Sequence, residues 1–134
     1  MKYEFYFHNS SIIVKPVIKG VNDTRGFDFI LDTGASRSII DVVAADRLGF
    51  DLKHLDSGDR LTTASGNVNS KVAILPKLSL FGKDFVDFEV NVLDLPNQIS
   101  FFADGLIGMD FLLQFGKMTF DFDEKTIETT SILA

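Results

Sequence analysis

One short segment of the chain combines the residue types that acid–base chemistry needs. The apolar run of residues 29–31 leads directly into Asp32, which is followed by Thr33, Gly34 and Ala35. Glycine permits a tight turn because it adopts backbone conformations that other residues disfavour, and a Thr hydroxyl can hydrogen-bond within such a turn. The segment therefore presents a carboxylate at the end of a strand, on a rigid loop beside an apolar core. That setting suits a carboxylate that exchanges protons during catalysis.

A second segment further along the chain has its own regular pattern. Leu106 and Ile107 are apolar, Gly108 follows them, and Asp110 stands where a helix would begin. Taken alone, this pattern is typical of an ordinary strand-to-helix junction. An isolated Asp-Thr-Gly is equally typical of a structural turn whose Asp binds only its own backbone. The two segments are specific only in combination.

Together the two segments resemble those of the retropepsin-like aspartic proteases, the single-lobe relatives of pepsin. The resemblance covers roughly residues 12–122. It implies that Asp32 is the catalytic carboxylate, that Thr33, Gly34 and Ala35 support its loop, and that the second segment passes beneath the site. The structural motif under the site would then comprise Leu106, Ile107, Gly108 and Asp110.

The resemblance also implies a β-hairpin flap that closes over the substrate. Residues 61–68 occupy the corresponding place, with Ala64, Ser65 and Gly66 as its substrate-facing part and Gly66 near the tip. Viral relatives carry acidic residues after Asp-Thr-Gly-Ala that pair with an Arg in the second segment. This chain instead has Ser36, Arg37 and Met109 at those places, so it looks more like cellular and bacterial members of the family.

Alternation of apolar and polar residues dominates the rest of the chain and predicts strands. In the first strand Tyr3, Phe5 and Phe7 share one face, as a half-buried strand requires. Gly82 and Lys83 are predicted to form a hairpin turn. Strands are expected at residues 2–8, 12–19, 26–31, 77–81, 85–93, 118–122 and 126–129. Short helices are expected at residues 41–48, capped by Asp41 and ended by Gly49, and at residues 110–115, capped by Asp110 and ended by Gly116.

Many short strands with two short helices are typical of a mainly β fold, closed or sandwiched. The family resemblance narrows this expectation to a closed acid-protease-type β-barrel with a flap hairpin and one or two short helices. The length of 134 residues and the lack of a linker or repeat predict one domain spanning residues 1–134.

Composition argues against several other classes of site. The chain has no Cys, which excludes a thiol nucleophile and a Cys-ligated zinc site. Its net charge of −6 argues against nucleic-acid and anionic-membrane partners. His8 and His54 lack the spacing of a zinc site, so neither a metal nor another cofactor is expected. The Asp-Ser-Gly triplet at Asp56 lacks a preceding apolar strand. Without a signal peptide or spanning segment in the sequence, a cytoplasmic location is expected.

These observations predict an aspartic endopeptidase that hydrolyses peptide or protein substrates. One carboxylate cannot serve as acid and base at once, so two copies of the chain are expected to bring Asp32 together at the axis of a homodimer. The strand of residues 2–8 and the tail of residues 132–134 are candidate edge strands for that pairing. Two alternatives remain open: a non-catalytic retropepsin-like module that dimerises or binds peptide, and a β-barrel that binds a small ligand.

Overall fold

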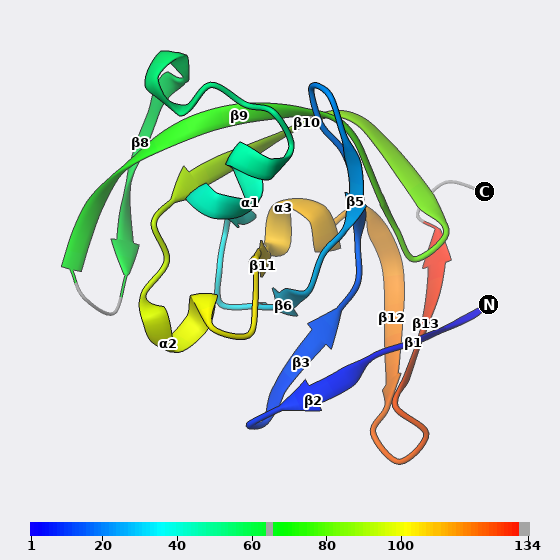
Figure 1. The fold of residues 1–134 in the computed structure, drawn as a ribbon. Coiled ribbons are helices and arrows are strands. Elements are labelled where there is room, and N and C mark those ends of the chain that lie inside the picture. The colour runs from blue at the N-terminus through cyan, green and yellow to red at the C-terminus, as the bar shows by residue number, and fades with distance from the viewer. Residues whose placement is uncertain (64–65, 132–134) are drawn as a thin grey trace.

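The computed structural model describes residues 1–63 and 66–131, and these form mainly β-strands (Figure 1). The strands are β1 (Lys2–Glu4), β2 (Tyr6–His8), β3 (Ser11–Val14), β4 (Val17–Lys19), β5 (Thr24–Gly26), β6 (Phe29–Leu31), β7 (Ile39–Asp41), β8 (Asp56–Thr63), β9 (Gly66–Leu80), β10 (Lys83–Leu93), β11 (Gly105–Ile107), β12 (Phe115–Asp121) and β13 (Thr126–Ser131). The helices are α1 (Val42–Arg47), α2 (Asn97–Ser100), α3 (Met109–Leu112) and the 3-10 turn η1 (Leu52–His54). In the described part of the chain, none of them is long and apolar enough to cross a membrane.

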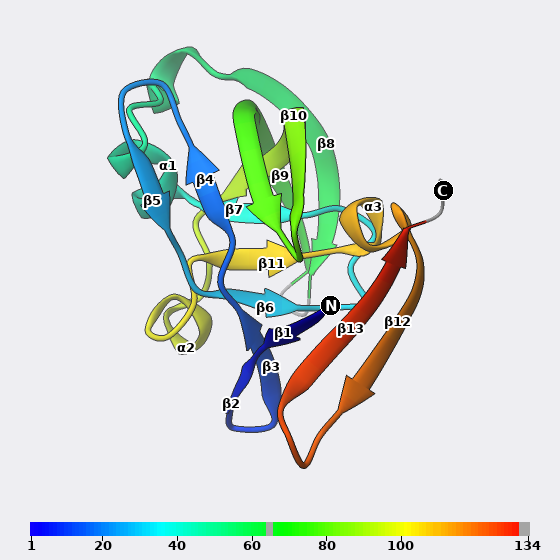
Figure 2. The ribbon, with the colours of Figure 1, turned by 90° about the vertical axis from the view of Figure 1, so that its right-hand side faces the viewer.

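The strands form two sheets. The larger runs in the order β2-β3-β6-β11-β7-β10-β9-β4-β5, with β8 paired to β9, and the smaller runs in the order β1-β13-β12. Figure 2 shows β12 and β13 standing to one side of the larger sheet, next to α3. Among the described residues no pairing joins β2 to β5, the two ends of the larger sheet. The mainly β prediction is confirmed, whereas the predicted closure into a barrel is not.

The predicted first strand is divided at Phe5 and contributes to both sheets. β1 pairs with β13 in the smaller sheet, and β2 pairs with β3 in the larger. Phe5 lies at the break with only 4% of its surface exposed, whereas Phe7 is 39% exposed. The rings of Phe5 and Phe7 still contact each other, with centroids 5.3 Å apart, although the chain changes sheets between them.

Two further strand predictions shift for local reasons. The expected strand of residues 12–19 breaks between β3 and β4, where Pro16 has no N–H to donate to a neighbouring strand. The β9–β10 hairpin turns at Phe81 and Gly82, with φ of 53° and 71°, and pairs Leu80 with Lys83. The predicted turn at Gly82 and Lys83 is thus one residue late. Positive φ at both central residues is the geometry of a primed turn, which matches the twist of paired strands.

The helices agree with prediction at one place and differ at another. Asp41 caps α1 by accepting a hydrogen bond from the Val43 amide at 3.1 Å, as predicted. α3 begins at Met109 with Gly108 as its N-cap, so Asp110 lies in the first turn and is not the cap. The carboxylate of Asp110 is used in a contact with a distant segment instead, as described below. The single turn α2 was not predicted, because four residues carry too little periodicity.

Aromatic side chains anchor the segment that runs beneath the candidate site. Phe111 of α3 is fully buried, and its ring centroid lies 4.8 Å from that of Phe85 and 5.5 Å from that of Phe115. Both neighbours are held in strands of different sheets, β10 and β12. Because a buried aromatic ring removes a large apolar area from water, Phe111 fixes the position of α3 and of the turn that precedes it.

Candidate active site

Asp32 follows the last residue of β6, and its backbone is tied to the neighbouring strand. Its amide donates a hydrogen bond of 2.9 Å to the carbonyl of Ile107, at the end of β11. The Gly34 amide donates to Oδ1 of Asp32 at 2.9 Å, and the Ala35 amide donates to the Asp32 carbonyl at 3.2 Å. Asp32 is half-buried, while Thr33 and Gly34 are exposed. The structure thus places a carboxylate at a strand end, on a turn closed by its own hydrogen bonds.

The second predicted segment lies directly beside the first. β11 pairs in parallel with β6, so that Leu106 is opposite Ile30 and Ile107 is opposite Leu31. Its other edge pairs antiparallel with β7. The ends of β6 and β11 therefore lie side by side, and the residues that follow them, Asp32 and Gly108, are brought to the same edge of the sheet.

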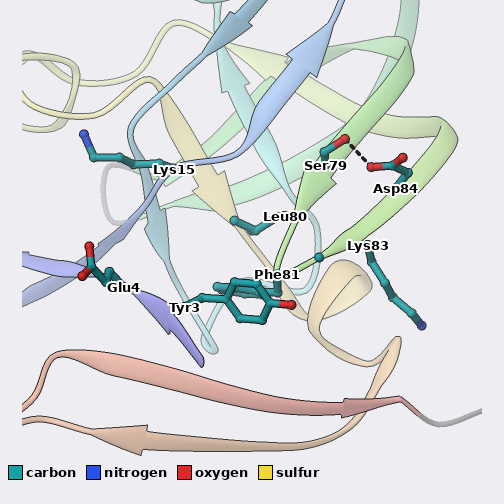
Figure 3. A pocket seen from close by; sticks show the side chains of 9 residues that line it. Tyr3, Glu4, Lys15, Ser79, Leu80, Phe81, Lys83 and Asp84 are labelled. Atoms are coloured by element: carbon teal, nitrogen blue, oxygen red, sulfur yellow. Dashed lines mark hydrogen bonds between the residues drawn. The ribbon is translucent and has the colours of Figure 1, made fainter. Parts of the chain in front are cut away.

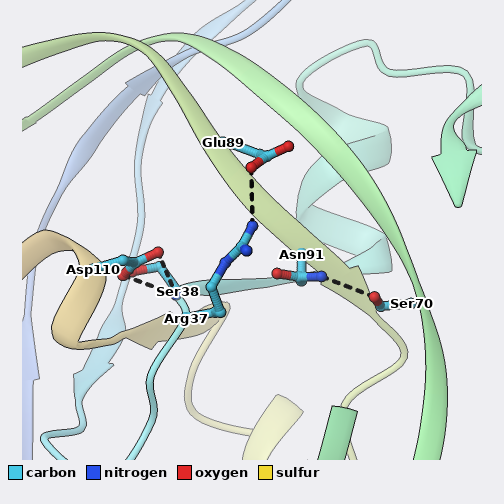
Figure 4. Close-up of polar contacts among 6 residues, drawn as sticks. All are labelled: Arg37, Ser38, Ser70, Glu89, Asn91 and Asp110. Atoms are coloured by element: carbon cyan, nitrogen blue, oxygen red, sulfur yellow. Dashed lines mark hydrogen bonds and ion pairs between the residues drawn. The ribbon is translucent and has the colours of Figure 1, made fainter. Parts of the chain in front are cut away.

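A network of hydrogen bonds joins the Asp32 loop to α3 (Figure 4). The carboxylate of Asp110 accepts from the Ser38 amide at 2.9 and 3.0 Å and from the Ser38 hydroxyl at 2.7 Å. The same hydroxyl oxygen accepts from the Gly108 amide at 2.9 Å. The Met109 amide donates to the Ala35 carbonyl at 2.7 Å. Ser38 is fully buried, and sequence analysis missed it because no local pattern marks a serine whose partner is 72 positions away.

Gly108 is required by the close approach of these two segments. A Cβ atom at this position would lie 2.7 Å from the Ala35 carbonyl oxygen and 2.8 Å from the backbone of Arg37. Real Cβ atoms do not come this close to backbone, so the loop and α3 pack this tightly only around a glycine.

Arg37 extends from the same loop toward β10. Its guanidinium forms an ion pair of 3.0 Å with the carboxylate of Glu89 (Figure 4). Two residues further along β10, Asn91 is buried and donates to the Ser70 hydroxyl at 2.8 Å. Within the described part of the chain, Oδ1 of Asn91 has no hydrogen-bond partner. The Arg37–Glu89 ion pair connects the loop to β10, and the Asn91–Ser70 bond joins β10 to β9.

A pocket of about 450 Å³ opens beside Asp32. Its lining includes Ile30 and Leu106, from the paired strands β6 and β11. The remaining lining comes from the β2–β3 hairpin, the end of β6 and the α2 region: Ser10, Ser11, Ile12, Leu31, Ile99 and Phe102. The pocket thus combines apolar side chains with two serines and the Asp32 carboxylate. Sequence analysis did not find Ile99 and Phe102, because their segment carries no motif and is placed by tertiary contacts.

The predicted flap region forms the β8–β9 hairpin, in which Thr63 pairs with Gly66. Ala64 and Ser65 lie outside the described residues. Gly66 has a φ of 112°, a conformation that favours glycine. Near the end of the hairpin where Thr63 pairs with Gly66, side chains of both strands pack against a small apolar cluster that also contacts two residues of the pocket. The cluster is Ile39, Leu93 and Leu95, with Leu61 and Val68 from the hairpin and Ile99 and Leu106 from the pocket.

The opposite ends of β6 and β11 carry a second group of carboxylates. Oδ2 of Asp104 accepts a hydrogen bond of 3.0 Å from the Asp28 amide. Burial raises the pKa of Asp104, and the nearby charge of Asp28 raises it further. Burial, together with a hydrogen bond to Asp28, raises the pKa of Tyr6 to about 12. Lys15 lies 3.4 Å from the Asp28 carboxylate. This group is separated from Asp32 by the length of β6.

Other candidate positions are dispersed. Asp56, of the second Asp-Ser-Gly triplet, lies in β8 opposite Val72 and is exposed. His54 is exposed and bonds to Asp51, which lowers the pKa of that carboxyl. No group of three or more acidic or imidazole side chains gathers as a metal site in the part of the chain that the structure describes.

A second pocket, of about 400 Å³, lies where β1 approaches the β9–β10 hairpin (Figure 3). Charges of both signs line it, among them Glu4, Lys15, Lys83 and Asp84. The Ser79 hydroxyl bonds to Asp84 within it. Asp32 is not among its lining residues, so this pocket is separate from the candidate active site.

Comparisons with known proteins agree with this arrangement. The sequence model of a family described as aspartyl protease matches residues 17–111. Among solved structures, a retropepsin-like aspartic protease from Rickettsia conorii is similar, with 24% identity and a TM-score of 0.73 over 97% of this chain and 91% of that chain. Among curated protein sequences, none matches the chain.

Two further solved structures are similar at lower TM-scores. The EIAV protease complexed with the inhibitor HBY-793 has 22% identity and a TM-score of 0.61, covering 81% of this chain and 90% of its own. The retroviral protease-like domain of Ddi1 from Leishmania major has 19% identity and a TM-score of 0.60, covering 91% of this chain and 94% of its own. The predicted resemblance to retropepsin-like proteases is thereby confirmed at the level of the fold.

Proposed function

Because the chain belongs to the aspartyl protease family, we propose that it is an aspartic endopeptidase in which two copies each contribute Asp32. The observation that carries the proposal is the position of Asp32. It lies at the end of a strand, with its amide bonded to β11 and a pocket that includes apolar side chains beside it. In this proposal the chain acts as one domain of residues 1–134, with no metal or other cofactor.

The need for two copies follows from the chemistry. Hydrolysis by activated water requires a base and an acid at the same time, and the chain has one Asp32 loop. Two carboxylates at ~3 Å in an effective dielectric near ~20 repel by roughly 5 kcal/mol. Such a pair therefore shares one proton over a broad pH range. One Asp32 is then ionised while the Asp32 of the partner subunit is protonated.

The reaction uses these two states directly. The ionised carboxylate takes a proton from a water molecule, and the water oxygen attacks the carbonyl carbon of the peptide bond. The protonated carboxyl donates its proton to the carbonyl oxygen, which gives a neutral tetrahedral intermediate. The proton held by the first carboxylate then passes to the amide nitrogen and the carbon–nitrogen bond breaks, while the second carboxylate takes back a proton from one hydroxyl of the intermediate, which restores both groups to their starting states. No covalent bond to the protein forms.

The surrounding residues have supporting roles in this proposal. Thr33 braces the two loops at the dimer axis, Gly34 contacts the substrate backbone, and Ala35 holds α3 through its carbonyl. The hairpin around Gly66, including Ala64 and Ser65, covers the substrate. The packing of this hairpin on the same apolar cluster as two pocket residues supports that role.

The dimer is proposed to form through an outer strand. β1 pairs on one side with β13 of its own chain. It lies at an edge of the smaller sheet. An edge strand carries unpaired backbone groups that a second copy can satisfy. The tail of residues 132–134, the other expected edge, lies outside the described residues.

Substitution of Asp32 tests the proposal. We expect Asp32→Asn to reduce hydrolysis of an unfolded protein substrate by at least about 10²–10⁴-fold while the circular dichroism spectrum is unchanged, because the amide cannot accept the proton of water. Asp56→Asn is the matched control, since Asp56 belongs to the second Asp-Ser-Gly triplet. Substantial turnover by Asp32→Asn, or an equal loss in Asp56→Asn, would overturn the assignment.

Mixing wild-type and Asp32→Asn chains tests the shared site. Equal parts exchanged to equilibrium contain about one-quarter of dimers with two intact Asp32 residues, by random pairing of identical surfaces. Activity per total protein should then be about one-quarter of the wild-type value, whereas independent monomers would retain about half. Retention near half, with subunit exchange verified, would mean that each chain works alone.

The same assays distinguish the alternatives. A non-catalytic module would bind unfolded peptide but release no cleavage products, in both wild-type and Asp32→Asn chains. A small-ligand β-barrel would show neither peptide binding nor cleavage. The intact Asp-Thr-Gly favours the enzyme, because a module that only binds does not need a carboxylate at this position.

A further inference from the structure

The pocket beside Asp32 is lined in part by the ring of Phe102, which follows a helix of a single turn. Phe102 lines the pocket and lies between α2 and β11. α2 is a single helical turn, and its N-cap residue Pro96 makes no side-chain capping hydrogen bond. A helix this short is not stable by itself. The neighbouring ring, Phe101, is 87% exposed and packs against little. The position of Phe102 therefore depends on contacts from elsewhere in the fold.

His8, the last residue of β2, supplies such a contact. Its imidazole stacks on the Phe102 ring, with centroids 4.0 Å apart and planes 19° from parallel. His8 pairs with Ser11 of β3, across a two-residue turn in which Asn9 and Ser10 both have positive φ. A turn of this geometry holds the two strands in one register.

The support for His8 extends to the strand that carries Asp32. β3 pairs with β6 through Ile13 and Ile30, and Ile30 lines the pocket. Ser10 and Ser11, from the same β2–β3 hairpin as His8, line the pocket. The His8–Phe102 stack thus joins two segments that contribute lining residues, the β2–β3 hairpin and the α2 region.

We propose that His8 is a positioning residue that holds Phe102 as a wall of the pocket beside Asp32 and thereby sets the pocket's preference for a large apolar side chain of the substrate. This inference rests on the proposed function, because it takes the pocket as part of the substrate cleft. His8 itself does not line the pocket; it acts through Phe102. Without the imidazole, Phe102 loses its stacking partner and the wall is no longer held at one distance from the hairpin.

Binding of uncleavable peptides separates this inference from catalysis. Two peptides carry a methyleneamine in place of the central amide and differ only in having Leu or Ala before it. We expect full-length wild-type protein to bind the Leu peptide at least about tenfold more tightly than the Ala peptide. In His8→Ala this ratio should fall about two- to tenfold, the range expected for the loss of one aromatic stack.

Four variants make the test specific. His8→Phe keeps a flat ring and should retain the wild-type ratio within about twofold, while His54→Ala and Phe101→Ala should leave it unchanged. In a Phe102→Ala background, His8→Ala should have no further effect, because the two residues act through one contact. With a cleavable Leu substrate, His8→Ala should raise KM and leave kcat within about twofold.

The outcomes of the two proposals are distinguishable. An unchanged Leu-to-Ala ratio in His8→Ala, failure of His8→Phe to restore it, or equal binding of both peptides by the wild-type protein would overturn the role of His8. The role is also overturned if neither peptide binds. If the wild-type protein shows the ratio and its dependence on His8 but cleaves no substrate, the positioning role stands and the proposed peptidase activity fails.

Discussion

Removing the Asp110 carboxylate should destabilise the protein more than removing most other acidic groups. In Asp110→Ala, the amide and hydroxyl of Ser38 both lose the acceptor that they bond at 2.7–3.0 Å. Ser38 is fully buried, so water cannot replace that acceptor without a rearrangement of the loop. The Phe111 amide also loses its bond to the carboxylate, but it keeps one to the Gly108 carbonyl at 3.2 Å.

The magnitude follows from the two hydrogen-bond donors of Ser38, its amide and its hydroxyl, that would lose their acceptor. Leaving a buried donor without a partner costs about 1–3 kcal/mol, so Asp110→Ala should lower the free energy of unfolding by about 3–5 kcal/mol. That is a large part of the ~5–15 kcal/mol by which a domain is stable. Asp110→Asn keeps one acceptor oxygen, replaces the other with an NH2 donor and removes the charge, so its cost should be smaller, about 1–2 kcal/mol.

Urea unfolding followed by circular dichroism measures these differences. With a slope of roughly 2 kcal/mol per molar urea, the midpoint for Asp110→Ala should fall by about 1.5–2.5 M. Asp94→Ala is the control, because Asp94 is an exposed carboxylate, and its effect should be within about 0.5 kcal/mol. A loss below about 1 kcal/mol in Asp110→Ala would refute the view that this carboxylate is what satisfies Ser38.

Two other substitutions, on either side of β11, test the packing and the electrostatics of this part of the fold. Gly108→Ala should lower the free energy of unfolding in urea by about 2–4 kcal/mol, because its Cβ would lie 2.7 Å from the Ala35 carbonyl oxygen. Gly26→Ala is the control and should cost little, because its Cβ would meet nothing within 4 Å. Similar losses of stability in both variants would contradict the steric argument. Burial raises the pKa of Asp104, so ionising this carboxyl costs more in the folded protein than in the unfolded chain. The cost arises as the pH rises above the pKa that Asp104 has in the unfolded chain. Asp104→Asn should therefore stabilise the protein at pH ~7 but not near pH ~3. Exposed Asp46→Asn is the control, and a gain for Asp104→Asn that is equal at both pH values would disprove the burial effect.

Features that depend on a few consecutive residues were predictable from the sequence. The turn after Asp32 requires only a carboxylate, a glycine and the amides between them, and the structure closes it with the bond from Gly34 to Asp32. The Asp41 cap of α1 is equally local. Combined with the second segment, these patterns identified a mainly β retropepsin-like fold, because each is set by the conformational preferences of its own residues.

Predictions of where one strand ends and the next begins were less accurate, because the burial of individual side chains can override the alternation of apolar and polar residues. Alternation in residues 2–8 is consistent with one strand, but burial of Phe5 at the break leads the chain from one sheet into the other. A hydrophobic pattern states which side chains prefer to be buried, not which sheet buries them. The role of Asp110 was misassigned for a similar reason, since a helix cap and a distant serine compete for the same carboxylate.

The walls of the candidate site were decided by tertiary structure alone. Phe102 lies in a segment with no strand or helix periodicity, and its stack with His8 joins residues from opposite ends of the chain. The parallel pairing of β6 with β11 likewise brings Asp32 beside a segment that is remote in sequence. The sequence by itself determined the candidate carboxylate, its turn and the class of fold, because these depend on neighbouring residues. Only the tertiary structure decided which side chains surround that carboxylate, because such contacts form when the whole chain buries its apolar surface together.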